Sequence, residues 1–172
     1  AYFQRGLLLK DEPTQHAAAI ADFNRILELD SRRDDARRML IGMYLAQDNQ
    51  SEATRELRQL LQRVPLDRQV RLALINQHMA AKDWVSASIL ADEGITLQPN
   101  EATWPDAKAK LAHRAGRPDE VMEHLKRVVE LAPTPINLSR YALTLLANDR
   151  AEEMLSLMRE HAELVNRYPT LE

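Results

Sequence analysis

The chain carries few residue arrangements that could support catalysis or bind a metal ion. Its five histidines never show the His-x-x-x-His spacing that places two imidazoles on one helix face for zinc. Cysteine is absent, and the four glycines form no phosphate-binding loop. No Gly-x-Ser-x-Gly motif marks a serine nucleophile. We therefore expect the chain to be no enzyme, and to hold neither a metal nor a cofactor.

Paired acidic residues are the remaining source of carboxylate chemistry. Asp34 and Asp35 are adjacent, as are Glu152 and Glu153, and both pairs stand where a helix is expected to begin. A carboxylate in the first turn of a helix interacts favourably with the helix dipole. That structural role explains these pairs better than an acid/base couple does.

The overall charge argues against nucleic acid as a partner. The 172 residues include 23 Lys and Arg against 26 Asp and Glu, which gives a net charge of −3, whereas nucleic-acid binders usually have a strong basic excess. No run of 18 apolar residues occurs, so we expect no membrane insertion. The excess of arginine (18) over lysine (5) favours a bacterial source, in which either cytoplasm or periplasm would suit the chain.

A repeat of 34 residues organises the chain. Pro65, Pro99 and Pro133 are each 34 residues apart, and Ser31 continues the series toward the N-terminus. Three further columns keep the same register: Ala19, Ala53, Ala87 and Val121; Phe23, Leu57, Ala91 and Leu125; Ile26, Leu60, Gly94 and Val128. An internal repeat of this length is typical of stacked helical units. Repeats are expected at about 1–32, 33–66, 67–100, 101–134 and 135–169 within a single array spanning 1–170.

Each repeat has the hydrophobic period of two helices. Residues 53–64 place apolar side chains on one helical face, and so do residues 121–132. Each column proline disfavours the α conformation in the residue before it, so the second helix of each repeat should end there. Gly94 falls inside a helix, where a close approach of another helix would explain it. The expected helices are 2–11, 15–29, 33–47, 50–63, 68–81, 84–96, 104–115, 118–131, 135–147 and 150–167.

These columns resemble the pattern of the tetratricopeptide repeat (TPR) family. The second repeat carries it most fully, with Leu40, Tyr44, Ala53, Leu57 and Pro65 at the matching positions. The fifth repeat departs from it, because its closing Pro169 comes two residues late. The resemblance implies an all-α fold, a right-handed α-solenoid of about five TPR-like helix–turn–helix repeats. It also implies that the first helices of the repeats line a concave face on which a protein or peptide partner binds.

Mapped onto this chain, that face forms a candidate binding groove with a basic C-terminal half. Such a surface suits a peptide with an acidic end, because arginine binds carboxylates through two hydrogen bonds. A solvated wall without a partner is the alternative interpretation. The candidate groove residues are Arg38, Met39, Gln69, Leu72, Asn76, Lys110, His113, Arg114, Arg140 and Tyr141.

The function predicted from the sequence is a protein–protein interaction scaffold, as one segment of a larger bacterial protein. Two alternatives remain open. The chain could be a TPR appendage of a larger enzyme or of an outer-membrane polysaccharide export machine. It could also self-associate as a homodimer through an uncapped last helix that carries Met154, Leu157 and Met158, since repeat arrays need a polar cap at each end. Residues 171–172 are expected to be a cloning remnant.

Overall fold

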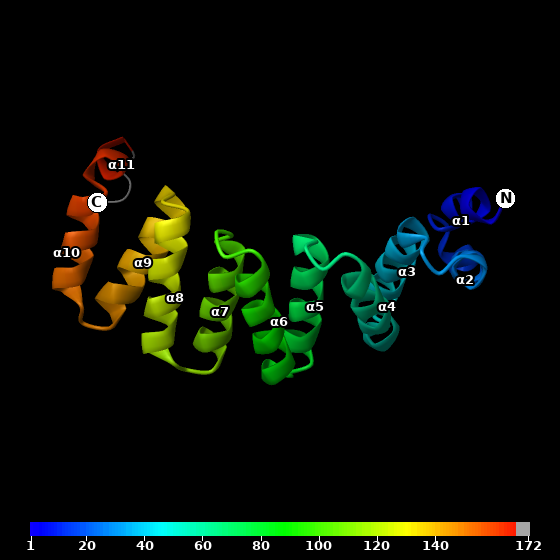
Figure 1. Cartoon of the computed structure of the whole chain (residues 1–172), viewed down its shortest axis with the longest axis horizontal. Coiled ribbons are helices and arrows are strands. Elements are labelled where there is room, and N and C mark those ends of the chain that lie inside the picture. The colour runs from blue at the N-terminus through cyan, green and yellow to red at the C-terminus, as the bar shows by residue number, and fades with distance from the viewer. Residues whose placement is uncertain (168–172) are drawn as a thin grey trace. The chain divides into compact units, whose positions relative to one another are not determined.

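The structure, a computed structural model, describes residues 1–167, which form α-helices joined by short turns without any strand (Figure 1). The expected all-α fold class is confirmed. The helices are α1 (Tyr2–Leu9), α2 (His16–Leu29), α3 (Asp34–Ala46), α4 (Gln50–Arg63), α5 (Arg68–Ala80), α6 (Trp84–Leu97), α7 (Thr103–Arg114), α8 (Pro118–Leu131), α9 (Pro135–Ala147), α10 (Ala151–Glu160) and α11 (Ala162–Arg167), with a 3-10 turn η1 (Pro13–Gln15) before α2.

The repeat columns are the buried positions of the second helices. Ala19, Ala53, Ala87 and Val121 are all less than a tenth exposed, and the other two columns are buried in the same four helices. Small and branched apolar residues at one register therefore keep one face of α2, α4, α6 and α8 out of water. This burial is the physical basis of the 34-residue period.

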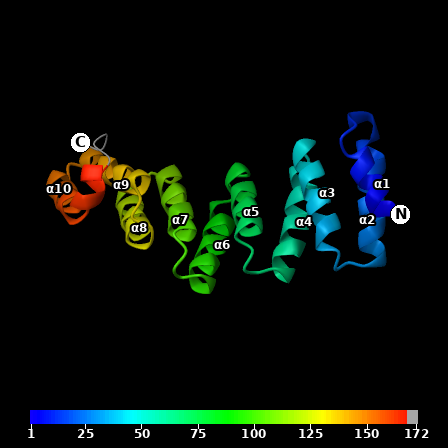
Figure 2. The ribbon, with the colours of Figure 1, turned by 90° about the horizontal axis from the view of Figure 1, so that it is seen from above.

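The helices form two compact units, one of residues 1–80 and one that begins at Ala81. In the first unit, α1 to α5 follow one another as neighbours, and α3 packs along α4 (Figure 2). Phe23, Leu40 and Ala53 lie in a core shared by α2, α3 and α4, against which Phe3 of α1 packs. Phe3 meets Phe23 edge to face, with ring centroids 5.8 Å apart.

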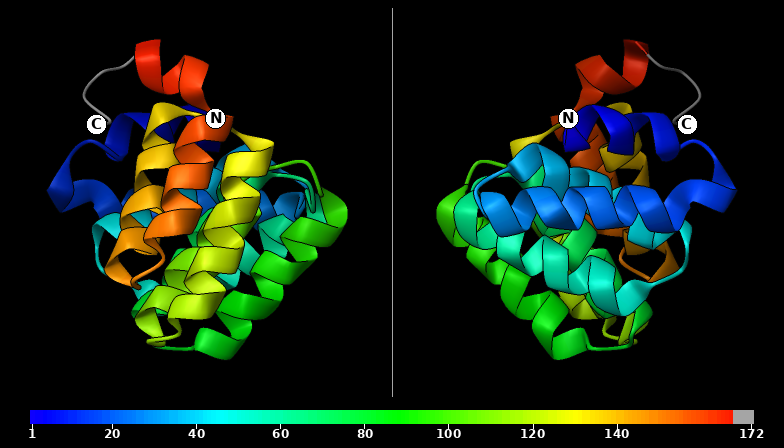
Figure 3. Two further views of the ribbon diagram at one scale, coloured as in Figure 1. Left: turned by 90° about the vertical axis from the view of Figure 1, so that its left-hand side faces the viewer. Right: turned by 90° about the vertical axis from the view of Figure 1, so that its right-hand side faces the viewer.

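The second unit contains α6 to α11. Its core is formed by α7, α8 and α9 with Leu157 of α10, and Leu138 and Leu145 of α9 are completely buried in it. Seen end-on, α8, α9 and α10 lie side by side, and α11 turns away from the end of α10 (Figure 3). The single expected helix 150–167 is therefore wrong in one respect, because the helix is interrupted at His161. No proline or glycine lies at that interruption.

The turn between the two helices of a repeat is the same in four places. Asp48, Lys82, Gly116 and Asp149 each have a positive φ of 55° to 67°, which lets the chain reverse in one residue. The first three are 34 residues apart, and Asp149 comes after 33. The irregularity of the fifth repeat thus begins with one residue fewer before its turn. Pro169 and residues 171–172, on which the sequence-based expectations for this end depend, lie outside the described residues.

Gly94 allows α6 to approach α7 closely, as the sequence predicts. A Cβ atom placed on Gly94 would lie 2.5 Å from Cδ2 of Trp104, whose side chain is fully buried. Gly42, in the middle of α3, has nothing within 4 Å of the same position. The two glycines thus occupy opposite environments within otherwise similar helices.

We expect Gly94→Ala to lower the free energy of unfolding by about 1–3 kcal/mol, because the new methyl group forces the buried indole of Trp104 to move. Gly42→Ala is the matched control, and it should raise the free energy of unfolding by about 0.5–1 kcal/mol through helix propensity alone. Urea unfolding followed by circular dichroism measures both changes. Equal, stabilising effects of the two substitutions would show that α6 and α7 are not in close contact at Gly94.

Candidate protein-binding surface

The first unit presents five of the predicted groove residues, on the first helices α3 and α5. Gln69 and Asn76 are exposed, and Leu72 is half-buried. Met39 was expected in the groove, but its half-buried side chain packs against the hydrophobic core of the first unit. Met39 therefore acts mainly in folding, and it offers little surface to a partner.

Arg38 is the basic residue among these five predicted groove residues, and it pairs with Asp67, the residue that caps the start of α5. Its guanidinium lies 2.6 Å from Asp67, and Asp67 also accepts a hydrogen bond of 3.0 Å from the backbone N–H of Val70 at the start of α5. Burial opposes ionisation of Asp67, but the Val70 N–H and Arg38 outweigh it, so the pKa of Asp67 lies below its usual value. Arg38 and Asp67 therefore form a pair without net charge.

In the second unit, two of the predicted basic residues share one acidic partner. The side chains of Lys110 of α7 and Arg140 of α9 each lie 2.7 Å from a carboxylate oxygen of Asp106. Burial disfavours the charged form of Asp106, yet the ion pairs with Lys110 and Arg140 keep its pKa lowered. This ion-pair network links α7 to α9 and leaves a net charge of +1 on the three groups.

Arg114 and His113 complete this basic region at the end of α7. Both side chains are exposed, and neither has a hydrogen-bond or ion-pair partner among the side chains that the structure describes. Arg114 can therefore turn its guanidinium to a ligand without first breaking an ion pair. We call Asp106, Lys110, Arg114 and Arg140, together with His113, the basic first-helix surface.

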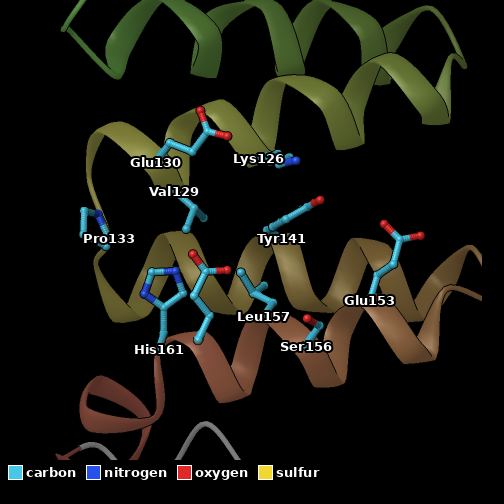
Figure 4. Close-up of a pocket in the computed structure, with 10 residues that line it drawn as sticks. Lys126, Val129, Glu130, Pro133, Tyr141, Glu153, Ser156, Leu157 and His161 are labelled. Atoms are coloured by element: carbon cyan, nitrogen blue, oxygen red, sulfur yellow. The ribbon is translucent and has the colours of Figure 1, made fainter.

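Tyr141 does not belong to this surface, contrary to the sequence-based expectation. Adjacent residues on a helix point about 100° apart, and while Arg140 faces Asp106, Tyr141 is 93% buried in the core. Its ring instead lines a pocket of about 450 Å³ between the second helices α8 and α10, into which Val129 and Leu157 also project (Figure 4). Sequence reasoning missed this pocket, because it depends on which face of α10 meets α8.

The residues predicted for self-association are also part of the core. Leu157 is 92% buried, and Met154 and Met158 pack against the same cluster. The large apolar side chains of α9 and α10 that are exposed include Ile136, Leu143 and Leu146 of α9 and Leu155 of α10. The three predicted residues therefore stabilise the last helical pair and offer little contact area to a second copy.

The described residues contain neither a cluster of metal ligands nor a membrane-spanning helix. In that part of the chain, no group of three or more His, Asp or Glu side chains is placed to hold a metal ion. Between residues 1 and 167 no helix combines the length and the apolar character needed to cross a membrane.

Comparison with known proteins identifies the fold. No known family model matches the sequence, and no curated protein matches it. Among solved structures, the chain is similar to MamA, with a TM-score of 0.68 and 13% identity over 94% of this chain and 95% of that chain. MamA from Desulfovibrio magneticus RS-1 gives a TM-score of 0.67 with 10% identity over 97% and 94% of the two chains.

A protein described as a thermophilic TPR protein shows the same similarity. It comes from Thermus thermophilus and aligns with a TM-score of 0.57 and 19% identity over 99% of this chain and 93% of that chain. The architecture defines an α-helical repeat protein, and these comparisons show that its fold is that of the TPR α-solenoids. The resemblance inferred from the sequence columns is thus confirmed for the fold.

Proposed function

We propose that the chain is a protein-interaction scaffold that binds an acidic segment of a partner on the basic first-helix surface. The observation that supports this most is Arg114, an exposed guanidinium without an acidic partner in the described part of the chain, next to the Lys110–Asp106–Arg140 network. Arginine pairs with carboxylates through two parallel hydrogen bonds.

The TPR fold favours binding over catalysis. In stacked repeats, neighbouring hairpins bury each other's apolar faces and leave an extended surface of first helices. Such a surface can follow an extended peptide over several side chains. The sequence-based alternatives, a role as an appendage of a larger enzyme or export machine and self-association, stay predictions.

The proposal is tested with a dye-labelled acidic peptide, Glu-Asp-Leu-Glu-Asp, by fluorescence anisotropy. We expect saturable binding, which Arg114→Glu combined with Arg140→Glu should weaken by about 10- to 100-fold, as expected for losing charge-assisted hydrogen bonds of about 1.5–3 kcal/mol. Because Arg140→Glu also puts a second carboxylate beside Asp106, Arg114→Glu alone is measured as well, and it should weaken binding by at least about fivefold.

The matched control reverses two arginines on second helices, Arg127 of α8 and Arg159 of α10. This control changes the net charge equally and should leave the dissociation constant within about twofold, because the two side chains lie outside the basic first-helix surface. Circular dichroism confirms that each variant keeps its helices. Binding that is unaffected by the first pair, or weakened equally by both pairs, would contradict the proposal.

A further inference from the structure

A second surface of the same unit has the opposite charge and a different shape. We infer that the pocket between α8 and α10, here the α8–α10 pocket, binds a short peptide segment in which a large apolar side chain is flanked by lysine or arginine. The inference goes beyond the proposed function by naming a second site with a different partner chemistry. It does not depend on the acidic segment proposed for the basic first-helix surface.

The floor of the α8–α10 pocket is apolar. Val129 of α8, Tyr141 of α9 and Leu157 of α10 are each more than 90% buried, and Figure 4 shows them facing the same space. Pro133, which closes the repeat, borders the pocket at the end of α8. A volume of about 450 Å³ lies within the range of small-ligand sites and exceeds what one leucine side chain fills. The shape therefore suits an apolar anchor with room for the flanking backbone.

Tyr141 supplies an unused polar group to this floor. The residue as a whole is 93% buried, but its hydroxyl is open to solvent, and no hydrogen bond from the described residues engages it. A tyrosine hydroxyl can both donate and accept a hydrogen bond, so this group can pair with a ligand in the pocket in place of water. Burial raises the pKa of Tyr141, and the Glu153 carboxylate adds to this shift against the opposing effect of Arg150. The hydroxyl thus keeps its proton at neutral pH.

The rim of the pocket is acidic. Three carboxylates border it, those of Glu130, Glu153 and Glu160. Among the lining residues they are opposed by one basic side chain, that of Lys126. Glu130 and Glu153 have arginine partners at 3.0 and 2.5 Å, but both pairs are about half exposed and therefore weak. Glu160 has no such partner in the described part of the chain. These carboxylates favour a cationic ligand over an anionic one.

A neighbouring pocket shows which of these features are specific. The α6–α8 pocket, of about 380 Å³, lies one repeat earlier between α6 and α8, and Pro99 takes the place of Pro133. It is bordered by two acidic and two basic side chains, namely Glu123, Glu130, Lys126 and Arg127, and it has no tyrosine. Glu130 and Lys126 border both pockets, so the features that distinguish the α8–α10 pocket are the phenol of Tyr141 and the carboxylates of Glu153 and Glu160. The α6–α8 pocket therefore serves as an internal control.

The test follows amide chemical shifts of the ¹⁵N-labelled chain during titration with the peptide Gly-Lys-Leu-Arg-Gly. We expect saturable shifts centred on Val129, Tyr141 and Leu157, with a dissociation constant below about 1 mM. Two control peptides separate the contributions: Gly-Glu-Leu-Asp-Gly reverses the charge, and Gly-Lys-Gly-Arg-Gly removes the apolar anchor. Each control peptide should bind at least about tenfold more weakly, because it loses either the charge complementarity or the buried side chain.

Substitutions in the chain distinguish the contribution of the Tyr141 hydroxyl to peptide binding from that of the acidic rim. Tyr141→Phe keeps the ring and should weaken binding by about 2- to 10-fold, as expected for one hydrogen bond. Glu160→Lys should weaken it by at least about tenfold, while Glu123→Lys, the same reversal in the α6–α8 pocket, should stay within about twofold. The spectrum of each variant without peptide shows that the fold is kept.

The other outcomes overturn the inference. These are the absence of saturable shifts, shifts centred on the α6–α8 pocket, equal binding of the charge-reversed peptide, or binding that Tyr141→Phe and Glu160→Lys both leave unchanged. Shifts of the same residues that grow with protein concentration before peptide is added would assign the pocket to a second copy of the chain. Arg114→Glu should bind the basic peptide normally, so failure at one surface is distinguishable from failure at the other.

Discussion

Replacing Glu56 with leucine should lower the free energy of unfolding by about 3–5 kcal/mol. Glu56 of α4 forms an ion pair with Arg37 of α3, and both side chains are only 5% exposed. Removing one partner leaves the other charge buried without compensation, which costs far more than the net value of the pair. The guanidinium of Arg37 also contacts Gln59 and donates a hydrogen bond of 3.2 Å to the carbonyl of Ser31. The side chain of Gln59 and the carbonyl of Ser31 are uncharged acceptors, so they do not replace the negative charge of the Glu56 carboxylate.

The double variant Arg37→Met with Glu56→Leu is the control that isolates the buried charge. Because apolar side chains of similar volume often replace a buried ion pair without loss, the double variant should recover most of the lost free energy of unfolding. Equilibrium urea unfolding of the two single variants and the double variant gives the coupling energy. A single variant that loses less than about 1 kcal/mol would show that water reaches Arg37 in solution.

Replacing Leu125 with alanine should lower the free energy of unfolding by about 2–5 kcal/mol, because it leaves a cavity in the core of the second unit. Leu125 of α8 is 96% buried among residues of α7, α8 and α9. It occupies the same repeat column as Phe23 of α2 and Leu57 of α4, which are also buried. The size of the loss reports how tightly the second unit is packed.

Leu143→Ala is the matched control for Leu125→Ala. Leu143 of α9 is 66% exposed, so the same truncation should change the free energy of unfolding by no more than about 0.5 kcal/mol. Thermal unfolding at several protein concentrations compares the two variants. A large, concentration-dependent loss for Leu143→Ala would mean that the exposed end of α9 is buried against a second copy. Equal losses for the two variants would contradict the assignment of the core.

The positions of the helices were predictable from the sequence because the same residue pattern recurs in several repeats, and each occurrence indicates the same helix boundaries. Pro65, Pro99 and Pro133 mark the ends of α4, α6 and α8, and the buried columns identify the inward face of each. Helices α4 and α8 therefore begin and end as expected. The interruption at His161 was not predictable in this way. It lies in the fifth repeat, where the turn at Asp149 comes one residue early and the column register no longer applies.

The candidate surfaces were predictable only in part, because their neighbours come from other repeats. Lys110 and Arg114 are four residues apart on α7, and the sequence places both on the first-helix surface. Their electrostatic environment depends on Asp106, which also binds Arg140 from the next first helix. The burial of Tyr141 depends on how α9 is rotated against α8 and α10, which adjacent positions in the sequence do not specify.

Site-specific photo-crosslinking tests the proposed scaffold function most directly. A photoreactive phenylalanine analogue in place of His113 lies beside Arg114 on the basic first-helix surface, and the same analogue in place of Gln62 lies on the second helix α4 as a control. We expect irradiation in the native cells to attach an acidic segment of one protein to position 113, identified by mass spectrometry, and Arg114→Glu to abolish that adduct. Adducts to the same protein from position 62 and none from position 113 would contradict binding on the first helices.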